Sequence, residues 1–259
     1  MKNKLPIADC RSSIRKWPDA RRAFLIINRK SQIINAFTLV EVLTVIAIIA
    51  VIAALILPVA SAVKRHAAMQ TAQTEMAQIE TAIERYHSAY GFYPPGNART
   101  ANNLRSALTN QLYYELVGTT NVAAPGVSPI YAPLDNPSHQ LSAAQVSAAF
   151  GVAGFMNCNK PGGDESASRA QNFFPDLKLN QMGTINTNGI SITNLVTSVG
   201  GPDSDYQPLG VLDMNPWRYV YPGTNNPGSY DLWVQLKLAG QTNLICNWNN
   251  RVQINSLLP

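Results

Sequence analysis

Residues 37–63, FTLVEVLTVIAIIAVIAALILPVASAV, decide the fold of this chain. The last 22 of them, residues 42–63, carry no charge, and as an α-helix they would be about 33 Å long. The hydrocarbon core of a bilayer is about 30 Å thick. Lys and Arg are dense on the N-terminal side of this run, which predicts an N-in, C-out orientation. The sequence therefore predicts a single transmembrane helix within residues 37–63.

A secretory signal peptide is the obvious competitor for this stretch. Such a signal has an apolar core of about 7–15 residues, followed by a small-x-small cleavage site. The apolar run here is longer, and ALILPVASA at residues 54–62 is only a fair cleavage site. The membrane helix is therefore the favoured interpretation.

The charge of the chain is divided unevenly along its length. Residues 1–36 hold nine Lys or Arg and two Asp, whereas residues 37–259 hold eleven basic and thirteen acidic side chains. A nucleic-acid-binding protein keeps its positive charge on the folded part, because contacts to phosphates dominate its affinity. We therefore expect no nucleic-acid partner, although the net charge of the whole chain is +5.

Residues 35–43, NAFTLVEVL, carry a resemblance to a known family. The segment resembles the class III leader of type IV prepilins and type II secretion pseudopilins, in which a small residue precedes Phe-Thr-Leu-Ile/Val-Glu and a long apolar helix. The resemblance implies that a prepilin peptidase removes the leader, residues 1–36, by cutting between Ala36 and Phe37 on the cytoplasmic face. N-methylation of the Phe37 amine is implied to follow. The family usually has Gly where this chain has Ala36, and its leaders are usually shorter.

The same resemblance implies a role for Glu41 in setting the register of a filament, by pairing with the N-terminal amine of a neighbouring subunit. An ammonium and a carboxylate are each costly in lipid, and they offset one another when they pair. Taken alone, Glu41 could equally be an interfacial carboxylate that reaches the headgroups. Pro58 matches a proline often seen in these helices and would kink the helix, unless the helix simply tolerates it.

The helical pattern continues past the uncharged run. Apolar residues recur every three or four positions from Met69 to Tyr90, which predicts that residues 64–90 form an amphipathic, periplasmic part of the same helix. Gly91 and the Pro-containing residues 92–96 cannot continue it. The predicted helix covers residues 38–90 and is about 80 Å long.

The rest of the chain divides into two regions. Residues 91–210 are predicted to be a loop-rich insertion with short helices at residues 103–117 and 142–150. Residues 211–259 are predicted to form a β-hairpin from residues 219–221 and 230–234, with a third strand at 244–248. The helix end and this hairpin resemble the major pseudopilin G type.

Pseudopilins of the G type bind Ca²⁺ in a loop after the second strand of the hairpin. The corresponding residues 235–241 of this chain hold no carboxylate, and Ca²⁺ needs six or more oxygen ligands. We therefore predict no metal and no cofactor.

The remaining reactive residues are few. Cys10 lies in the leader, which leaves Cys158 and Cys246 as a candidate disulfide or as two buried small side chains. The chain shows no nucleotide-binding, metalloprotease or serine-hydrolase motif, and its three histidines stand apart. We therefore expect a protein that is not an enzyme.

Together these features predict an α+β fold. A long N-terminal helix with a transmembrane first half would pack on a small antiparallel β-sheet head that carries a loop-rich, partly helical insertion. The predicted function is that of a structural subunit of a pilus-like filament, either a type II secretion pseudopilin or a type IV pilin-like protein. The predicted partners are a prepilin peptidase, other copies of this chain or other pilins, and the bacterial inner membrane, with the head in the periplasm or outside.

A binding module is the alternative function. In it, a membrane-anchored head would use the insertion to recognise a secreted substrate, a surface polymer or DNA. Such a head should expose a contiguous aromatic or charged patch within residues 97–210. The aromatic residues of that region, which would equally suit a core, are Tyr113, Tyr114, Phe150, Phe155, Phe173 and Phe174.

Overall fold

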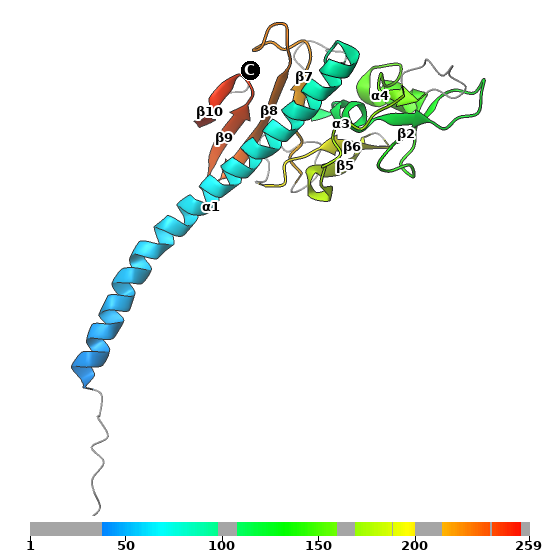
Figure 1. The fold of residues 1–259 in the computed structure, drawn as a ribbon. Coiled ribbons are helices and arrows are strands. Elements are labelled where there is room, and N and C mark those ends of the chain that lie inside the picture. Colours follow the sequence, from blue (N-terminus) through cyan, green and yellow to red (C-terminus); the bar gives the residue numbers. More distant parts are fainter. Residues whose placement is uncertain are drawn as a thin grey trace, which may run out of the picture. The chain divides into compact units, whose positions relative to one another are not determined.

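A single long helix, α1 (Leu39–Tyr90), is the first element in the described part of the chain (Figure 1). The computed structural model describes residues 38–97, 108–159, 169–187, 189–199, 214–238 and 240–254. Two compact units divide the chain, Met1–Val51 and Ile52–Pro259, and α1 contributes residues to both. The 52 residues of α1 end at the position that the sequence predicts, because Gly91 takes a φ of 79° and its N–H donates to the His87 carbonyl oxygen at 2.7 Å.

The predicted transmembrane segment, residues 37–63, is wrong. A membrane-spanning helix needs about 20 consecutive apolar residues. No helix within the described residues combines sufficient length with sufficient apolar character to cross a membrane. The predicted single-pass, N-in and C-out location in the bacterial inner membrane is overturned by the same finding.

The C-terminal sheet has the strand order β10-β9-β8-β7, and all its neighbouring strands are antiparallel. The predicted hairpin and third strand are confirmed as β7, β8 and β9, whereas the outer strand β10 was not predicted. Leu232, Val234 and Leu236 alternate along β8 and join α1 residues in one hydrophobic core. The strands are β7 (Arg218–Val220), β8 (Asp231–Leu238), β9 (Gln241–Cys246) and β10 (Asn249–Ile254).

The region between α1 and this sheet holds more regular structure than the sequence predicts. One sheet has the order β3-β2-β1-β4, in which β1 and β4 are parallel, and β5 and β6 form a separate antiparallel hairpin. The elements are α3 (Leu112–Val117), β1 (Thr119–Asn121), β2 (Ile130–Pro133), β3 (Leu141–Ser142), α4 (Ala143–Phe150), β4 (Cys158–Asn159), η1 (Leu179–Gln181), β5 (Met182–Thr187) and β6 (Ile190–Leu195).

The predicted fold class is therefore wrong in two respects. The predicted transmembrane first half of the helix is not found among the described residues, and the region predicted to be a loop-rich insertion holds a four-stranded and a two-stranded sheet. The strands of residues 119–195 are only two to six residues long and rich in polar side chains, so they leave little periodic signal. Buried polar residues hold them through specific hydrogen bonds, as when the Asn157 amide donates to the carbonyl oxygens of Glu115 and Gln171, both at 2.7 Å.

The two predicted helices of this region have different outcomes. The second is confirmed as α4, whose N-cap Ser142 accepts from the Gln145 N–H while the Gln145 side chain accepts from the Ser142 N–H. Of the first, predicted at residues 103–117, α3 covers Leu112–Val117, and residues 109–111 directly before α3 are not helical. There the Asn110 side chain accepts a hydrogen bond from the Leu112 N–H, which favours a turn over a continuous helix.

Candidate assembly interface

The first turn of α1 is closed by Thr38 and Glu41. The Thr38 carbonyl accepts from the Val42 N–H at 3.2 Å, so Thr38 is the N-cap. Its hydroxyl accepts from the Glu41 N–H at 3.2 Å, and its own N–H and hydroxyl donate to Glu41 Oε2 at 2.8 and 2.9 Å. These contacts form a capping box.

The capping box also sets the charge of Glu41. The hydrogen bonds from Thr38 lower the pKa of the Glu41 carboxyl, so the side chain is anionic at neutral pH. The other carboxylate oxygen, Oε1, accepts no hydrogen bond within the described residues, although the side chain is fully exposed. An anionic oxygen at the start of the helix is thus available to a donor from outside the chain.

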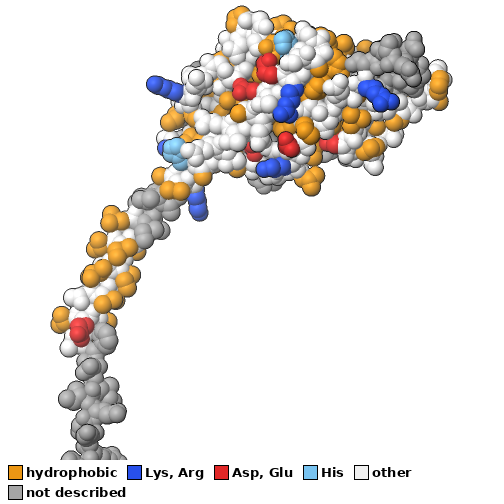
Figure 2. Space-filling view, in the orientation of Figure 1, with side chains coloured by type: hydrophobic (Ala, Val, Ile, Leu, Met, Phe, Trp, Pro, Cys, Tyr) orange, Lys and Arg blue, Asp and Glu red, His pale blue; other side chains and the backbone are white. Residues whose placement is uncertain are grey.

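Large apolar side chains flank Glu41 in the sequence and face solvent on all sides of the helix. Between Leu39 and Leu55 their exposed fractions range from 48% for Val42 to 80% for Leu39. Figure 2 shows these hydrophobic side chains along the helix surface. Exposed apolar surface of this extent marks an interaction site. We call the described residues of this stretch, 39–55, the apolar segment.

The later turns of α1 are held in the head by core packing. Within the unit Ile52–Pro259, the side chains of Ala72, Ile79, Ala82, Ile83 and Tyr86 are at most 3% exposed. They recur at the spacing of one helix face and pack in the core with β8 and α3 residues. This part of the helix is therefore a fixed element of the head.

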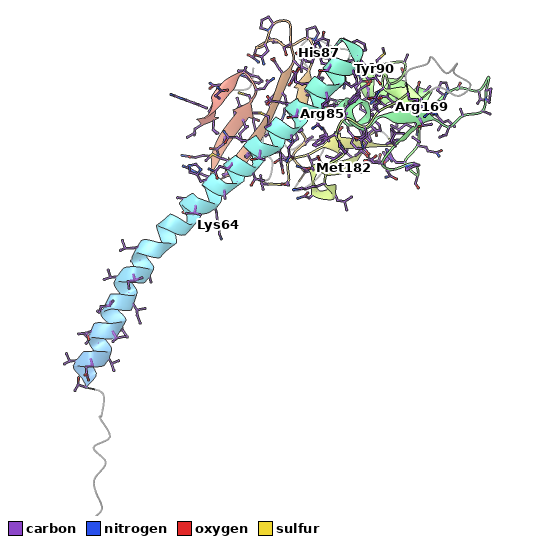
Figure 3. The ribbon with its side chains drawn as sticks, in the orientation of Figure 1. Lys64, Arg85, His87, Tyr90, Arg169 and Met182 are labelled. Atoms are coloured by element: carbon purple, nitrogen blue, oxygen red, sulfur yellow. The ribbon has the colours of Figure 1, made fainter. Side chains whose placement is uncertain are left out.

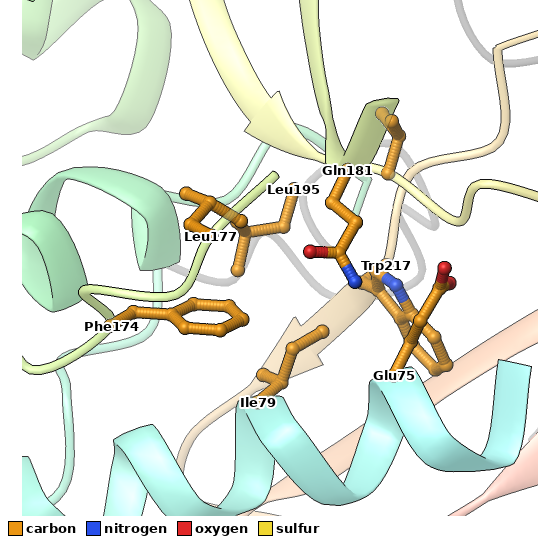
Figure 4. A pocket seen from close by; sticks show the side chains of 8 residues that line it. Glu75, Ile79, Phe174, Leu177, Gln181, Leu195 and Trp217 are labelled. Carbon is orange, nitrogen blue, oxygen red and sulfur yellow. The ribbon is translucent and has the colours of Figure 1, made fainter. Parts of the chain in front are cut away.

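Two buried carboxylates add polar anchors to this packing. Glu75 on α1 accepts from the Thr197 hydroxyl at 3.1 Å, from the Ser198 N–H at 3.2 Å and from the Ser198 hydroxyl. Figure 4 shows the pocket beside it, lined by Ile79, Phe174 and Trp217, whose walls leave no room for a bound molecule. The second carboxylate, Glu115 on α3, accepts from the hydroxyl of Tyr86.

An open groove lies between α1 and the β9–β10 turn. Its volume is about 280 Å³. The half-buried carboxylate of Glu80 is the acidic group among its lining residues, and burial, with a contribution from Glu84 one turn further on, raises its pKa. The other lining residues are Gln73, Met76, Ile245, Cys246, Asn247, Asn249, Asn250 and Val252.

The remaining sequence-predicted site residues are scattered. Ala36 and Phe37, the predicted cleavage site and methylation site, lie outside the described residues. Pro58 lies inside α1, and the helix continues through this position. Cys158 in β4 and Cys246 in β9 are both buried, and the candidate disulfide between them is not formed in the structure.

Neither the capping box nor the buried carboxylate of Glu115 was predicted from the sequence. The capping box was readable, because Thr-x-x-Glu before an apolar run is its signature, and residues 38–41 match it. The carboxylate of Glu115 had no such signal, since its partners Tyr86 and Asn157 come from distant parts of the chain.

The chemistry of the described residues is limited. Within them, no group of three or more His, Cys, Asp or Glu side chains lies together as a metal site would require. No protein-family model, curated protein or solved structure matches the chain.

Proposed function

We propose that this chain is a structural subunit of a pilus-like filament, of the type II secretion pseudopilin or type IV pilin-like kind. A prepilin peptidase would release it from its leader between Ala36 and Phe37, and the new Phe37 amine would be N-methylated. The subunit would then join other copies, or other pilins, through α1. The observation that carries the proposal is the contrast between the solvated apolar segment and the buried turns of the same helix.

The apolar segment supports association between copies. Solvated apolar surface is unfavourable by roughly 25 cal/mol for each Å², and equivalent surfaces of neighbouring copies can remove it from water. Because Ala and β-branched residues are mixed along residues 39–55, neighbouring helices can approach closely and interdigitate.

The state of Glu41 supports the proposed register role. Its carboxylate is anionic, and Oε1 is open to a donor, as the amine of a neighbouring subunit requires. Pairing an ammonium with this oxygen leaves the capping contacts of Thr38 with Oε2 in place. Glu41 can therefore cap its own helix and bind a neighbour at once.

The burial of the aromatic residues in the middle region bears on the alternative, a binding module. Such a head needs an exposed recognition patch, but the six aromatic side chains proposed for it are between 1% and 7% exposed and belong to the core. This favours the structural subunit over the binding module. That the chain is not an enzyme stays a prediction.

Expression of the full chain together with a prepilin peptidase tests the proposal. We expect mass spectrometry to find an N-terminus at methylated Phe37 and electron microscopy to find filaments that contain the head. Ala36→Leu should block the cut because a small residue is needed there, whereas the matched control Ala36→Gly should still be processed. An intact leader, a start after Ala62, or a processed chain that stays monomeric would each sink the proposal.

A further inference from the structure

We propose that Glu80 and Glu84 of one copy receive the Lys64 ammonium of a second copy, with the two copies parallel and offset along α1. The inference rests on the proposed filament function and adds a specific contact and register to it. It concerns a face of α1 in the unit Ile52–Pro259, on the rim of the groove beside β9 and β10.

The acidic side of the contact has no cationic partner among the described residues. Glu80 is half-buried in the groove and makes no hydrogen bond or ion pair with any described residue. None of the described residues that line the groove is a Lys or Arg. Glu84 lies one helical turn away, is exposed, and places a second negative charge beside the first. A cation from outside would relieve both the burial and the like-charge repulsion.

The amides of the groove suit an ammonium. Gln73 and Asn250 line it and have side-chain oxygens that can accept hydrogen bonds from the three N–H donors of a Lys. Met76 and Val252 offer apolar surface to the methylene stem of such a side chain. The groove therefore matches a long, flexible cation better than it matches an anion.

Helix geometry selects Lys64 as that cation. Lys64 precedes Glu80 by 16 residues and Glu84 by 20, which at 100° per residue places it about 160° and about 200° around the helix from them. Two parallel copies that are offset along the helix axis and not related by a two-fold axis meet through opposite faces, so a residue and its contact on the neighbour lie about 180° apart on each copy. The corresponding offset along the helix is about 24–30 Å.

The neighbouring cations on α1 are less suited. Arg65 donates from Nη1 to Oε1 of Gln241 at 2.9 Å, within its own head. His66 lies only about 40° around the helix from Glu80, on the same side rather than the opposite one. Lys64 is exposed, makes no hydrogen bond or ion pair with any described residue, and projects from α1 in Figure 3.

Zero-length carbodiimide cross-linking of filaments tests the contact directly. On one helix, Lys64 and Glu80 are separated by about 24 Å, so an amide bond between them must join two copies. Filaments grown from mixed light and ¹⁵N-labelled chains should yield a mixed-isotope peptide linking Lys64 to Glu80 or Glu84. Cross-links from Lys64 to other carboxylates alone would overturn the assignment.

Charge reversal provides a second readout. We expect Lys64→Glu to lower the filament yield about tenfold, as the loss of one close interfacial ion pair predicts, and Glu80→Lys to do the same. Combining the two should restore most of the yield, because the charges are exchanged. Arg251→Glu, an exposed reversal on β10, is the matched control and should assemble like the wild type.

The outcomes separate this contact from the proposed function. Filaments that form normally with Lys64→Glu and give no Lys64–Glu80 cross-link would overturn the contact and leave the function standing. A wild-type chain that is processed but never assembles would overturn both. A thermal melt would reveal whether Glu80→Lys fails to fold. In that case Lys64→Glu, a substitution at an exposed position, and the cross-link still test the proposed contact between Lys64 and Glu80.

Discussion

The hydroxyl of Tyr86 on α1 donates a hydrogen bond of 3.1 Å to Oε2 of Glu115 on α3, and both side chains are fully buried. The same carboxylate accepts from the N–H groups of Met156 and Asn157, at 2.9 and 3.0 Å. One side chain thus ties the long helix to two segments of the middle region. The end of α1 is therefore positioned by polar contacts as well as by apolar packing.

Removing this carboxylate should destabilise the head more than removing its tyrosine partner. Glu115→Ala leaves the backbone N–H groups of Met156 and the buried Asn157 without their acceptor and opens a cavity, so we expect a loss of about 3 kcal/mol or more in the free energy of unfolding. Tyr86→Phe removes one hydrogen bond and should cost about 1–2 kcal/mol. Urea unfolding followed by tryptophan fluorescence measures both.

The control for these two variants is Asp176→Asn, which changes an exposed carboxylate outside the core. It should unfold within about 0.5 kcal/mol of the wild type. Equal losses from Tyr86→Phe and Glu115→Ala would contradict the three-contact role of Glu115.

The same carboxyl should make stability depend on pH. Burial raises the pKa of Glu115 above its ordinary value of 4.5, although hydrogen bonds from Met156, Asn157 and Tyr86 oppose the rise. The folded chain therefore keeps this proton to higher pH than the unfolded chain does. Its contribution to stability is present below the unfolded pKa and is lost as the pH rises through the folded pKa.

A titration of unfolding free energy checks this sign. Between the two pKa values, the wild type should lose stability as the pH rises, and Glu115→Gln should lack that component because it cannot titrate. The difference between the two curves isolates Glu115 from other groups. A difference that is flat, or that has the opposite slope, would show that the carboxyl is not protonated preferentially in the folded state.

Asp231 at the start of β8 should be essential to the preceding turn. Its Oδ2 accepts from the N–H groups of Thr224 and Asn225 at 2.7 and 2.9 Å, and its Oδ1 accepts from the Asn226 N–H at 2.9 Å. Asp231→Ala leaves these three N–H donors without an acceptor. It should lower the free energy of unfolding by about 3 kcal/mol, as measured by urea unfolding. Gly223→Ala should also destabilise, because an added Cβ would lie 2.7 Å from Asp231 Oδ1.

Capping and register roles of Glu41 can be separated by a pair of variants. Thr38→Val removes the hydroxyl that bonds Glu41 but keeps the carboxylate, whereas Glu41→Ala removes both functions. If the carboxylate sets register, processed Glu41→Ala should lose filaments while Thr38→Val retains most of them. Equal filament loss in the two variants would instead assign Glu41 to capping alone. Filament mass after sedimentation is the measurement.

Much of the secondary structure was predictable because its signals are local. The spacing of apolar residues up to Tyr90, the Gly91 stop and the alternation in β8 each depend on neighbours in sequence. The signal of the Thr38–Glu41 capping box is equally local. The middle region was not predictable, because its short strands depend on partners such as Asn157 and Gln171 that only the folded chain brings together.

By itself, the sequence determined where the long helix ends, which strands form the C-terminal hairpin, and which segment carries the family resemblance at residues 35–43. Periodicity and helix-stop residues act within a few positions, so no tertiary context was needed. Only the tertiary structure decided that Glu115 is buried against Tyr86 and that Glu80 lies in a groove whose described lining residues include no Lys or Arg. Burial and charge pairing depend on distances between segments far apart in the chain, which no local pattern encodes.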